Sequence, residues 1–308
     1  MNTPEIRFVD NSNIDRMKWD KCISESPYGI SYAYSWYLDR ICPHWDALIS
    51  DDYHYVMPLV NNQKYGIKYI YQPFFTQQLG IFSALPVNET TVEQFIKTIP
   101  SKFRLADLNL NLGNTIKNSQ FLLKKNTTYH LSLNSDFERI QSAYNTNTKR
   151  NIQKALQSNL IISGSKEIDR FIAFTQNNLV SKAPEVKQEH YLSFCEIIRY
   201  ALANKLGEIN VVVNERGNWL SAVFFLKTNQ KYIYLAASST QEGTEKSAMF
   251  LLINNFICQN AKNNLILDFE GSNTRGIARF YTGFGANPQT YHSVHINRLP
   301  WLIRLLKK

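Results

Sequence analysis

The stretch from Gly207 to Thr240 constrains the fold most, and it reads GEINVVVNERGNWLSAVFFLKTNQKYIYLAASST. Three apolar runs are separated by the short polar breaks NERGN and KTNQ, which are typical of hairpin turns. The stretch therefore predicts three consecutive antiparallel strands. Such a meander must bury its apolar faces against helices or a second sheet.

The flanking segments indicate which partner covers the meander. EIDRFIAFTQNNLV and QEHYLSFCEIIRYALANK precede it with helical periodicity, and the apolar helix EKSAMFLLINNFICQNAKN follows it. A strand, a helix and a last strand, QTYHSVHIN, complete the order. This order predicts an α+β fold in which a mixed, mostly antiparallel sheet is flanked by helices.

The first half of the chain contains a segment that is weakly similar in sequence to part of the meander. PLVNNQKYGIKYIY can be aligned with FFLKTNQKYIYLA, which indicates a tandem duplication. A chain of 308 residues suits two domains of ordinary size. We therefore predict an N-terminal domain over residues 1–130 and a C-terminal domain over residues 131–308.

Charge and cysteine usage narrow the class of protein. The formal net charge of +9 favours anionic partners, such as nucleic acid, a phosphate-bearing co-substrate or a membrane surface. The 4 cysteines contain no CxxC spacing and do not form a disulfide framework. With no signal-like N-terminus and no apolar run near the ~18 residues of a membrane span, a cytoplasmic protein without a transmembrane segment is expected.

Chemistry concentrates in LILDFEGSNTRGIARFYTGFGA, from Leu265 to Ala286. In an extended strand, Asp268 and Glu270 lie on one face, about 7 Å apart. There they either orient or deprotonate an amine substrate, or they are a locally paired residue and a solvated edge residue.

The helix that follows this strand carries a second set of candidates. Ser272 or Asn273 is the expected N-cap, and the free N–H groups there favour an anion. Tyr281 belongs to an apolar stripe with Ile277, Phe280 and Phe284, whereas Arg275 and Arg279 share the opposite face. Tyr281 is therefore either a core residue or a catalytic hydroxyl.

Three further segments have a functional and a plain interpretation. Lys149 and Arg150, in the helix NTKRNIQKALQSN, either contact phosphate or form a solvated face. Gln77 and Gln78, in PFFTQQLG, either bind an acceptor in a cleft between the domains or close an irregular segment. The tail LPWLIRLLKK either lies on a membrane surface or docks on its own domain.

Other chemistries are not supported by the residue pattern. His292 and His295 point to opposite faces of a strand, so they make a poor metal pair, and no metal is expected. His190 and Cys195 diverge on a helix. Two carboxylates on one short strand do not flank a glycosidic bond, and the sequence contains no GxGxxG, GxxxxGK[ST] or GxSxG motif.

Several of these segments resemble the FemAB-type acyltransferases of the GNAT-fold group. The resemblance rests on the strand ending in Asp-Phe-x-Gly, the helix closing on RFYTGFGA, and YNTNTKRNIQKALQSNLII, with SPYGISYAYSWYLDRI and IYQPFFTQQLGIF in the first half. It implies two tandem GNAT-like domains. It also implies acyl or aminoacyl transfer to an amine acceptor, in cell-envelope or polysaccharide metabolism, with acyl-CoA or aminoacyl-tRNA as co-substrate and no tightly bound cofactor.

Two departures from the family pattern bear on the substrates. SSTQEGTEKSA stands where acetyl-CoA enzymes carry a glycine-rich pyrophosphate loop, and Tyr281 replaces a lysine typical of the enzymes that build peptidoglycan cross-bridges.

The resemblance also implies roles for the candidate residues. Asp268 or Glu270 receives the amine proton, Tyr281 protonates the leaving group, and backbone N–H groups near Ser239 and Thr240 stabilise the oxyanion. Asn273 and Arg275 join Ser239 and Thr240 in contacting the co-substrate. The alternative is a non-catalytic GNAT-like module that binds RNA or an envelope precursor.

Overall fold

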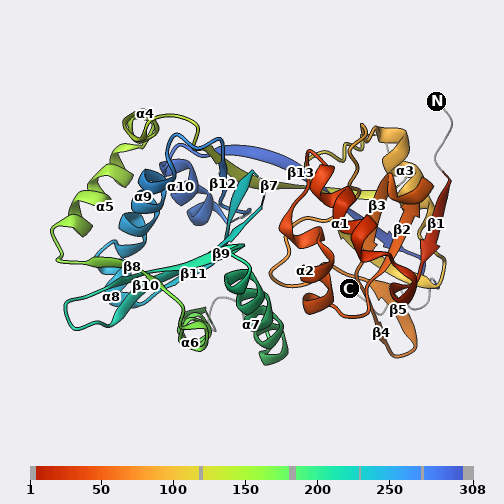
Figure 1. Ribbon diagram of the computed structural model, residues 1–308, viewed down its shortest axis with the longest axis horizontal. Coiled ribbons are helices and arrows are strands. Elements are labelled where there is room, and N and C mark those ends of the chain that lie inside the picture. The colour runs from red at the N-terminus through yellow and green to blue at the C-terminus, as the bar shows by residue number, and fades with distance from the viewer. Residues whose placement is uncertain (1–4, 118–120, 180–184, 229, 272–273, 301–308) are drawn as a thin grey trace. The chain divides into compact units, whose positions relative to one another are not determined.

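The computed structural model describes residues 5–117, 121–179, 185–228, 230–271 and 274–300 (Figure 1). Contacts divide the chain into two compact units: unit 1 is Met1–Asn126 with Thr290–Lys308, and unit 2 is Thr127–Gln289. The chain passes from unit 1 to unit 2 within β7 (Leu122–Ser132) and returns within β13 (Asn287–Asn297). This division differs from the predicted domains 1–130 and 131–308 chiefly over residues 290–308.

Unit 1 combines two sheets with helices. The antiparallel sheet β1-β2-β3 consists of Ile6–Val9, Asp46–Ser50 and Tyr55–Leu59. In the other sheet, β4 (Asn61–Lys64) pairs with β5 (Ile67–Ile70), β5 runs parallel to β6 (Phe103–Asn109), and β6 pairs with β13. The helices are α1 (Arg16–Glu25), α2 (Ser35–Ile41) and α3 (Glu89–Thr98).

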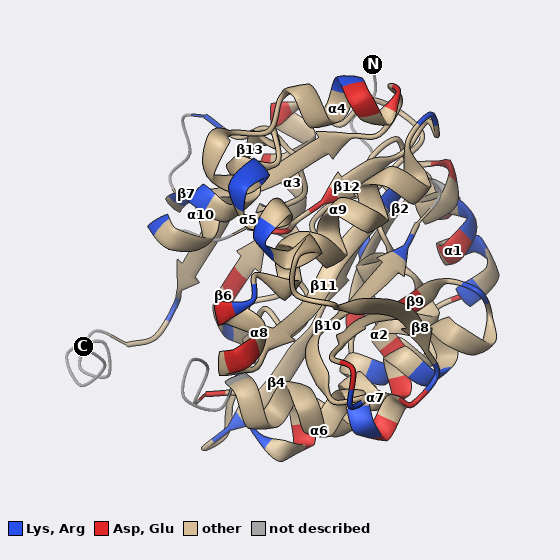
Figure 2. Ribbon diagram, turned by 90° about the vertical axis from the view of Figure 1, so that its left-hand side faces the viewer, with Lys and Arg blue, Asp and Glu red and all other residues tan. Residues whose placement is uncertain are grey.

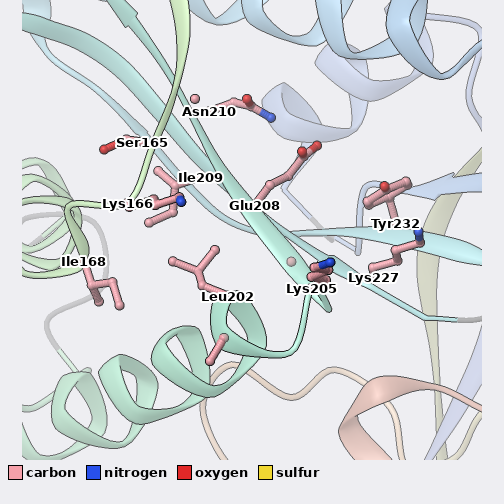
Figure 3. Close-up of a pocket in the computed structure, with 13 residues that line it drawn as sticks. Ser165, Lys166, Ile168, Leu202, Lys205, Glu208, Ile209, Asn210, Lys227 and Tyr232 are labelled. Atoms are coloured by element: carbon pink, nitrogen blue, oxygen red, sulfur yellow. The ribbon is translucent and has the colours of Figure 1, made fainter.

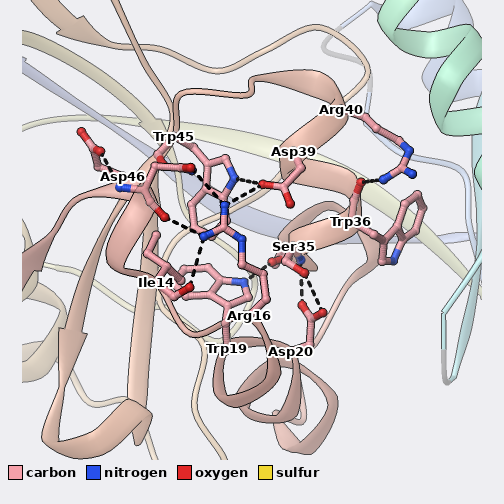
Figure 4. Close-up of polar contacts among 12 residues, drawn as sticks. Ile14, Arg16, Trp19, Asp20, Ser35, Trp36, Asp39, Arg40, Trp45 and Asp46 are labelled. Atoms are coloured by element: carbon pink, nitrogen blue, oxygen red, sulfur yellow. Dashed lines mark hydrogen bonds and ion pairs between the residues drawn. The ribbon is translucent and has the colours of Figure 1, made fainter.

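One arginine joins the first helices of unit 1 to its first sheet (Figure 4). Asp15 caps α1 by accepting hydrogen bonds from the N–H groups of Met17 and Lys18. The guanidinium of Arg16 donates to the carbonyl of Asn11 at 2.6 Å and pairs with Asp39 of α2 at 3.1 Å. Asp39 also accepts the indole N–H of Trp45 at 2.8 Å, directly before β2. These contacts satisfy the partly buried polar groups where the three elements meet.

Unit 2 is built on a single sheet of order β7-β12-β11-β10-β9-β8. Its strands besides β7 are β8 (Ile161–Ser165), β9 (Gly207–Val213), β10 (Trp219–Lys227), β11 (Lys231–Ser239) and β12 (Ile266–Asp268). All neighbours are antiparallel except β11 and β12. The predicted meander is confirmed as β9, β10 and β11.

Helices cover both faces of the unit 2 sheet (Figure 1). They are α4 (Phe137–Ser142), α5 (Thr146–Leu156), α6 (Ile168–Leu179), α7 (Gln188–Ala203), α8 (Gln241–Glu245), α9 (Ala248–Asn260) and α10 (Arg275–Gly283). In Figure 1, α5, α9 and α10 lie on one side of the sheet, and α6 and α7 on the other.

Two adjacent phenylalanines show why most positions of β10 are apolar. Phe225 stacks on Phe256 of α9, with ring centroids 3.7 Å apart, whereas Phe224 contacts Phe171 of α6 and Phe194 of α7. Because successive strand residues point to opposite faces, a strand covered on both sides must be apolar at every position. The run WLSAVFFL is buried at each position and is apolar except at Ser221, whose hydroxyl lies 2.8 Å from that of Ser239.

The structure agrees with the predicted fold class, since mixed, mostly antiparallel sheets flanked by helices occur in both units. The tandem duplication stays a prediction. None of the helices in the described ranges combines the length and the hydropathy of a membrane span. The proposed membrane contact of the C-terminal tail falls on residues 301–308, which lie outside the described residues.

Candidate functional site

The two parallel strands of unit 2 part at Asp268. β11 and β12 are paired only from Lys231 with Ile266 to Ile233 with Asp268. Beyond Asp268 the chain turns to β7, since the N–H of Phe269 donates to the carbonyl of Tyr129 at 2.9 Å. β11 runs on to Ser239, and in the described part of the chain only β10 pairs with it there. One edge of β11 is therefore left without a neighbouring strand.

The end of β12 is set by a local turn. Oδ1 of Asp268 accepts the N–H of Glu270 at 3.0 Å, and Glu270 has a φ of 59°, in the left-handed region. Asp side chains stabilise such turns by bonding the backbone two residues on. The left-handed conformation costs a non-glycine residue about 1 kcal/mol or more. The predicted strand face shared by Asp268 and Glu270 is thus wrong, because the strand ends between them.

Asp268 lies at the centre of a buried polar cluster. Its side chain accepts from the hydroxyl of Thr128 at 2.7 Å and lies 2.9 Å from Nε2 of His130, both on β7. Burial opposes ionisation of this carboxyl, but the hydrogen bond and charge of His130, the charge of Lys231 and the Thr128 hydrogen bond outweigh it. The pKa of Asp268 is therefore lower than its ordinary value. Asp268 is 1% exposed, so it fixes the strand end rather than facing a substrate directly.

Glu270 differs from Asp268 in its protonation. It is half-buried, and burial raises its pKa to about 8. The ordinary carboxyl value is near 4.5, so near neutral pH this group holds a proton that it can exchange. A carboxyl with a pKa near the working pH is suited to general acid–base chemistry.

Tyr281 of α10 lies beside this strand end. Its ring stacks on Phe269, with centroids 4.9 Å apart, and lies 5.8 Å from the ring of Tyr129 and 6.0 Å from that of Tyr234. Burial, and then the charges of Glu270 and Asp268, raise the pKa of the phenol. Tyr281 is 9% exposed, so it is a core residue as well as a polar group beside Glu270.

A bulge marks β11 next to the point where the strands part. Phe224 is paired with Ala236 and Phe225 with Tyr234, so Leu235 is an extra residue on β11. Bulges leave one residue out of the ladder and redirect the backbone. The bulge therefore alters the backbone polar groups that β11 presents near Glu270.

Ser239 and Thr240 bond within the fold. The N–H of Thr240 donates to the carbonyl of Leu220 at 2.9 Å, and its hydroxyl accepts the N–H of Gly243 at 3.0 Å as the cap of α8. The hydroxyl of Ser239 lies 2.8 Å from that of Ser221 on β10. The Thr240 N–H is thus already used, and it does not serve the predicted oxyanion contact in this structure.

The residues predicted at the start of α10 are only partly described. Asn273 and Ser272 lie outside the described residues. The N-cap of α10 is Thr274, and Arg275 is its exposed first residue. Ile277 is 43% exposed, so the predicted apolar stripe begins one turn later, at Phe280 and Tyr281.

The basic helix corresponds to α5, which carries Lys149 and Arg150 on an exposed face (blue in Figure 2). Lys149 Nζ donates to the carbonyl of Ser142 at 3.3 Å, and the Arg150 guanidinium donates to Asn147 at 3.4 Å. Both contacts are local and exposed, as expected for a solvated face.

Gln77 and Gln78 lie in unit 1 and bond to each other, with Gln78 Nε2 donating to Gln77 Oε1 at 2.6 Å. The carbonyl of Gln77 accepts from Asn109 at 2.8 Å, and Gln78 is 2% exposed. These contacts close an irregular segment, which is the plain interpretation of the two glutamines.

No cluster of metal-ligating side chains occurs among the described residues. His295 pairs with Asp107 at 2.6 Å, and His190 accepts the N–H of Lys187 at the start of α7. All four cysteines are free.

Sequence reasoning missed His130 and Thr128. Their i, i+2 spacing in TYHLSLNSD placed them on one strand face, which was the available signal. Nothing in the sequence indicated that this strand pairs with β12, because the bond from His130 to Asp268 spans 138 residues.

Comparison with solved structures gives the fold a precedent. FemX matches with a TM-score of 0.69 and 10% identity, over 99% of this chain and 100% of FemX. L-PGS from Bacillus licheniformis matches at 0.56 and 9%, over 95% of both chains. The C-terminal domain (DUF2156) of a protein from Agrobacterium fabrum, assigned as a lysylphosphatidylglycerol synthetase, matches at 0.56 and 7%, over 96% of this chain and 95% of that domain.

No protein-family model matches the sequence, and no curated protein matches it. The structural likenesses confirm the predicted fold, which this chain shares with FemX, L-PGS and the DUF2156 domain along its length.

Proposed function

We propose that this protein transfers an acyl or aminoacyl group to an amine acceptor where β11 and β12 part. The observation that carries the proposal is that the buried ring of Tyr281 stacks on Phe269, directly before Glu270, whose pKa burial raises to about 8. The fold shared with FemX and the family resemblance of the sequence support the same chemistry.

The proposed step balances with two proton transfers. The amine nitrogen bonds to the acyl carbon, and the bond from that carbon to the donor's leaving atom breaks. Glu270 accepts the proton that the amine loses while it is in its carboxylate form, which is the minor form at neutral pH because its pKa is about 8 and which increases as the pH rises. The phenol of Tyr281 supplies a proton to the leaving atom. The raised pKa of Tyr281 keeps the phenol protonated, so that it is ready to donate.

We place the oxyanion donors at the bulge of β11 rather than at Thr240. The Thr240 N–H is bonded to Leu220, whereas the bulge at Leu235 adjoins the free edge of β11. A backbone N–H that points to this edge costs no reorganisation when negative charge develops on the carbonyl oxygen.

The donor best supported is an oxygen ester, such as aminoacyl-tRNA, rather than acyl-CoA. The turn where CoA enzymes hold pyrophosphate uses the N–H groups of Thr240, Gly243 and Thr244 for bonds within the fold. A phenol of raised pKa also suits an alkoxide leaving group, which needs a proton more than a thiolate does. The net charge of +9 is compatible with a nucleic-acid donor.

A direct assay tests the proposal. The purified protein is incubated with aminoacyl-tRNA or acyl-CoA and a set of primary amines, and products are identified by mass spectrometry. Transfer from the oxygen ester is expected, and Tyr281→Phe should lower kcat by about 10²–10⁴-fold.

The matched control is Tyr144→Phe. Tyr144 is a second buried tyrosine of the same hydrophobic cluster, edge-on to Phe284 at 5.2 Å. Its hydroxyl has no hydrogen-bond partner among the described residues, so its loss should leave transfer unchanged. Steeply salt-dependent RNA binding without transfer from either donor would instead favour the non-catalytic alternative.

A further inference from the structure

A groove of about 880 Å³ opens in unit 2 at the start of β9 and β11 (Figure 3). Its walls come from the end of β8, the first turn of α6, the end of α7 and the end of β10. β11 separates from β12 as it continues to Ser239, and the groove lies at the other end of β11. The groove uses none of the residues proposed for acyl transfer.

Apolar side chains form part of the groove wall. Ile168 of α6, Leu202 of α7 and Ile209 of β9 contribute to it. Gly207 belongs to the same wall, and a Cβ there would lie 2.9 Å from the ring of Phe224, so the backbone approaches the core closely at this point. A volume of this size accommodates an organic ligand with an apolar portion.

Cations dominate the charge of the groove. Lys166, Lys205 and Lys227 contribute from three separate segments, and all three are exposed. Figure 3 shows Lys166 on one side of Glu208, and Lys205 and Lys227 toward the other. Lysines brought together in this way repel one another, and an anionic ligand between them relieves the repulsion.

Glu208 is the acidic residue among the described residues of the wall. Burial raises its pKa, against the hydrogen bond from Asn210 and the charge of Lys227. One carboxylate of this kind does not neutralise three lysines. Together with Asn210, it can also hydrogen-bond a polar group of a ligand.

We propose that this groove binds a phosphate-bearing ligand with an apolar chain, the phosphate between the lysines and the chain against Ile168, Leu202 and Ile209. Lysine ammonium groups bind phosphate as point charges, and the apolar wall excludes water from an alkyl group. A membrane lipid and a soluble phosphate ester share this chemistry.

Backbone geometry at Lys205 provides a sharp test. Lys205 follows α7 with a φ of 58°, and the N–H of Leu206 closes the helix end on the carbonyl of Ala201 at 2.7 Å. Glycine is favoured at this position, so Lys205→Gly should raise the melting temperature slightly while it removes a cation from the groove. Stability and affinity should therefore change in opposite directions.

Lys262→Gly is the matched control. Lys262 is also left-handed, with a φ of 67°, but it pairs with Asp136 and does not line the groove. Binding of n-hexyl phosphate to the full chain is measured by calorimetry, with inorganic phosphate and hexanol for comparison. Hexyl phosphate should bind the wild type most tightly, and Lys205→Gly should weaken it about fivefold, the effect of one exposed charge contact.

Two results would overturn the proposal: Lys205→Gly binds hexyl phosphate as tightly as the wild type does, or Lys262→Gly loses affinity equally. Vesicles that carry a dialkyl phosphate at their surface separate the two sources. Binding of vesicles alone indicates a lipid, binding of hexyl phosphate alone indicates a soluble ester, and either supports the groove if Lys205→Gly weakens it.

Discussion

At the scale of single residues, two carboxyls that are separated by one residue differ in their protonation. Asp268 accepts hydrogen bonds from Thr128 and from the backbone of Glu270, and it pairs with His130, so its charged form is favoured. The pKa of Glu270 rises to about 8 through burial. The sequence DFE does not by itself predict the lowered pKa of Asp268 or the raised pKa of Glu270. Both shifts arise from atoms that other segments bring to the strand end.

The raised pKa of Glu270 predicts a pH dependence of stability. Below pH 4.5 the folded and unfolded states both hold the proton, so the full stability is present. As pH rises toward 8 the unfolded carboxyl ionises first, and the free energy of unfolding falls by up to a few kcal/mol. Glu270→Gln, which cannot ionise, should remove this loss.

Urea unfolding between pH 4 and pH 9 measures the effect. Glu138→Gln, at an exposed position on α4, is the control and should follow the wild type. A Glu270→Gln curve parallel to the wild type across this range would show that Glu270 ionises normally in the folded protein.

At the scale of elements, a glycine decides how α8 packs, whereas a glycine in α10 lies in open space. A Cβ on Gly243 of α8 would lie 2.1 Å from the carbonyl oxygen of Leu220 on β10. The short helix therefore lies against the strand backbone, and its glycine serves close packing rather than a phosphate. A Cβ on Gly276 of α10 meets nothing within 4 Å.

The two glycines predict opposite effects of one substitution. Gly243→Ala should destabilise the protein by about 1–3 kcal/mol, because the strand backbone must move. Gly276→Ala should stabilise it by about 0.5–1 kcal/mol, since alanine favours the helix. Chemical denaturation of both variants measures the signs, and a neutral Gly243→Ala would contradict the close packing.

At the scale of the whole molecule, the chain crosses between its units twice, in β7 and in β13. A boundary after residue 130 cuts β7 two residues before its end. It separates Thr128 and His130 from Asp268, which would then be a buried carboxylate without its partners. Removing the partner of a buried charge is strongly destabilising, by about 3–5 kcal/mol.

Two fragments compare the alternative boundaries. A fragment of residues 127–289 keeps the cluster around Asp268, whereas a fragment of residues 131–308 loses it. The first should have the higher melting temperature by circular dichroism. The reverse order would mean that β7 contributes little to unit 2 and that the return strand β13 matters more.

Local patterns along the chain predicted the elements and indicated the candidate site. The meander, the amphipathic helices and the strand–turn–helix from Leu265 to Ala286 follow from the spacing of apolar residues and turn residues, which acts over a few positions. The sequence also indicated Glu270 and Tyr281 as candidates, and the fold of FemAB-type proteins.

Which of these residues lie together depends on the fold and not on local patterns. In the fold the Thr240 N–H donates to the carbonyl of Leu220, β12 ends at Asp268, and Asp268 pairs with His130. Burial in the fold also raises the pKa of Glu270, and three lysines from separate segments line one groove. Burial, pKa and pairing depend on atoms far apart along the chain, and no local pattern of residues encodes them.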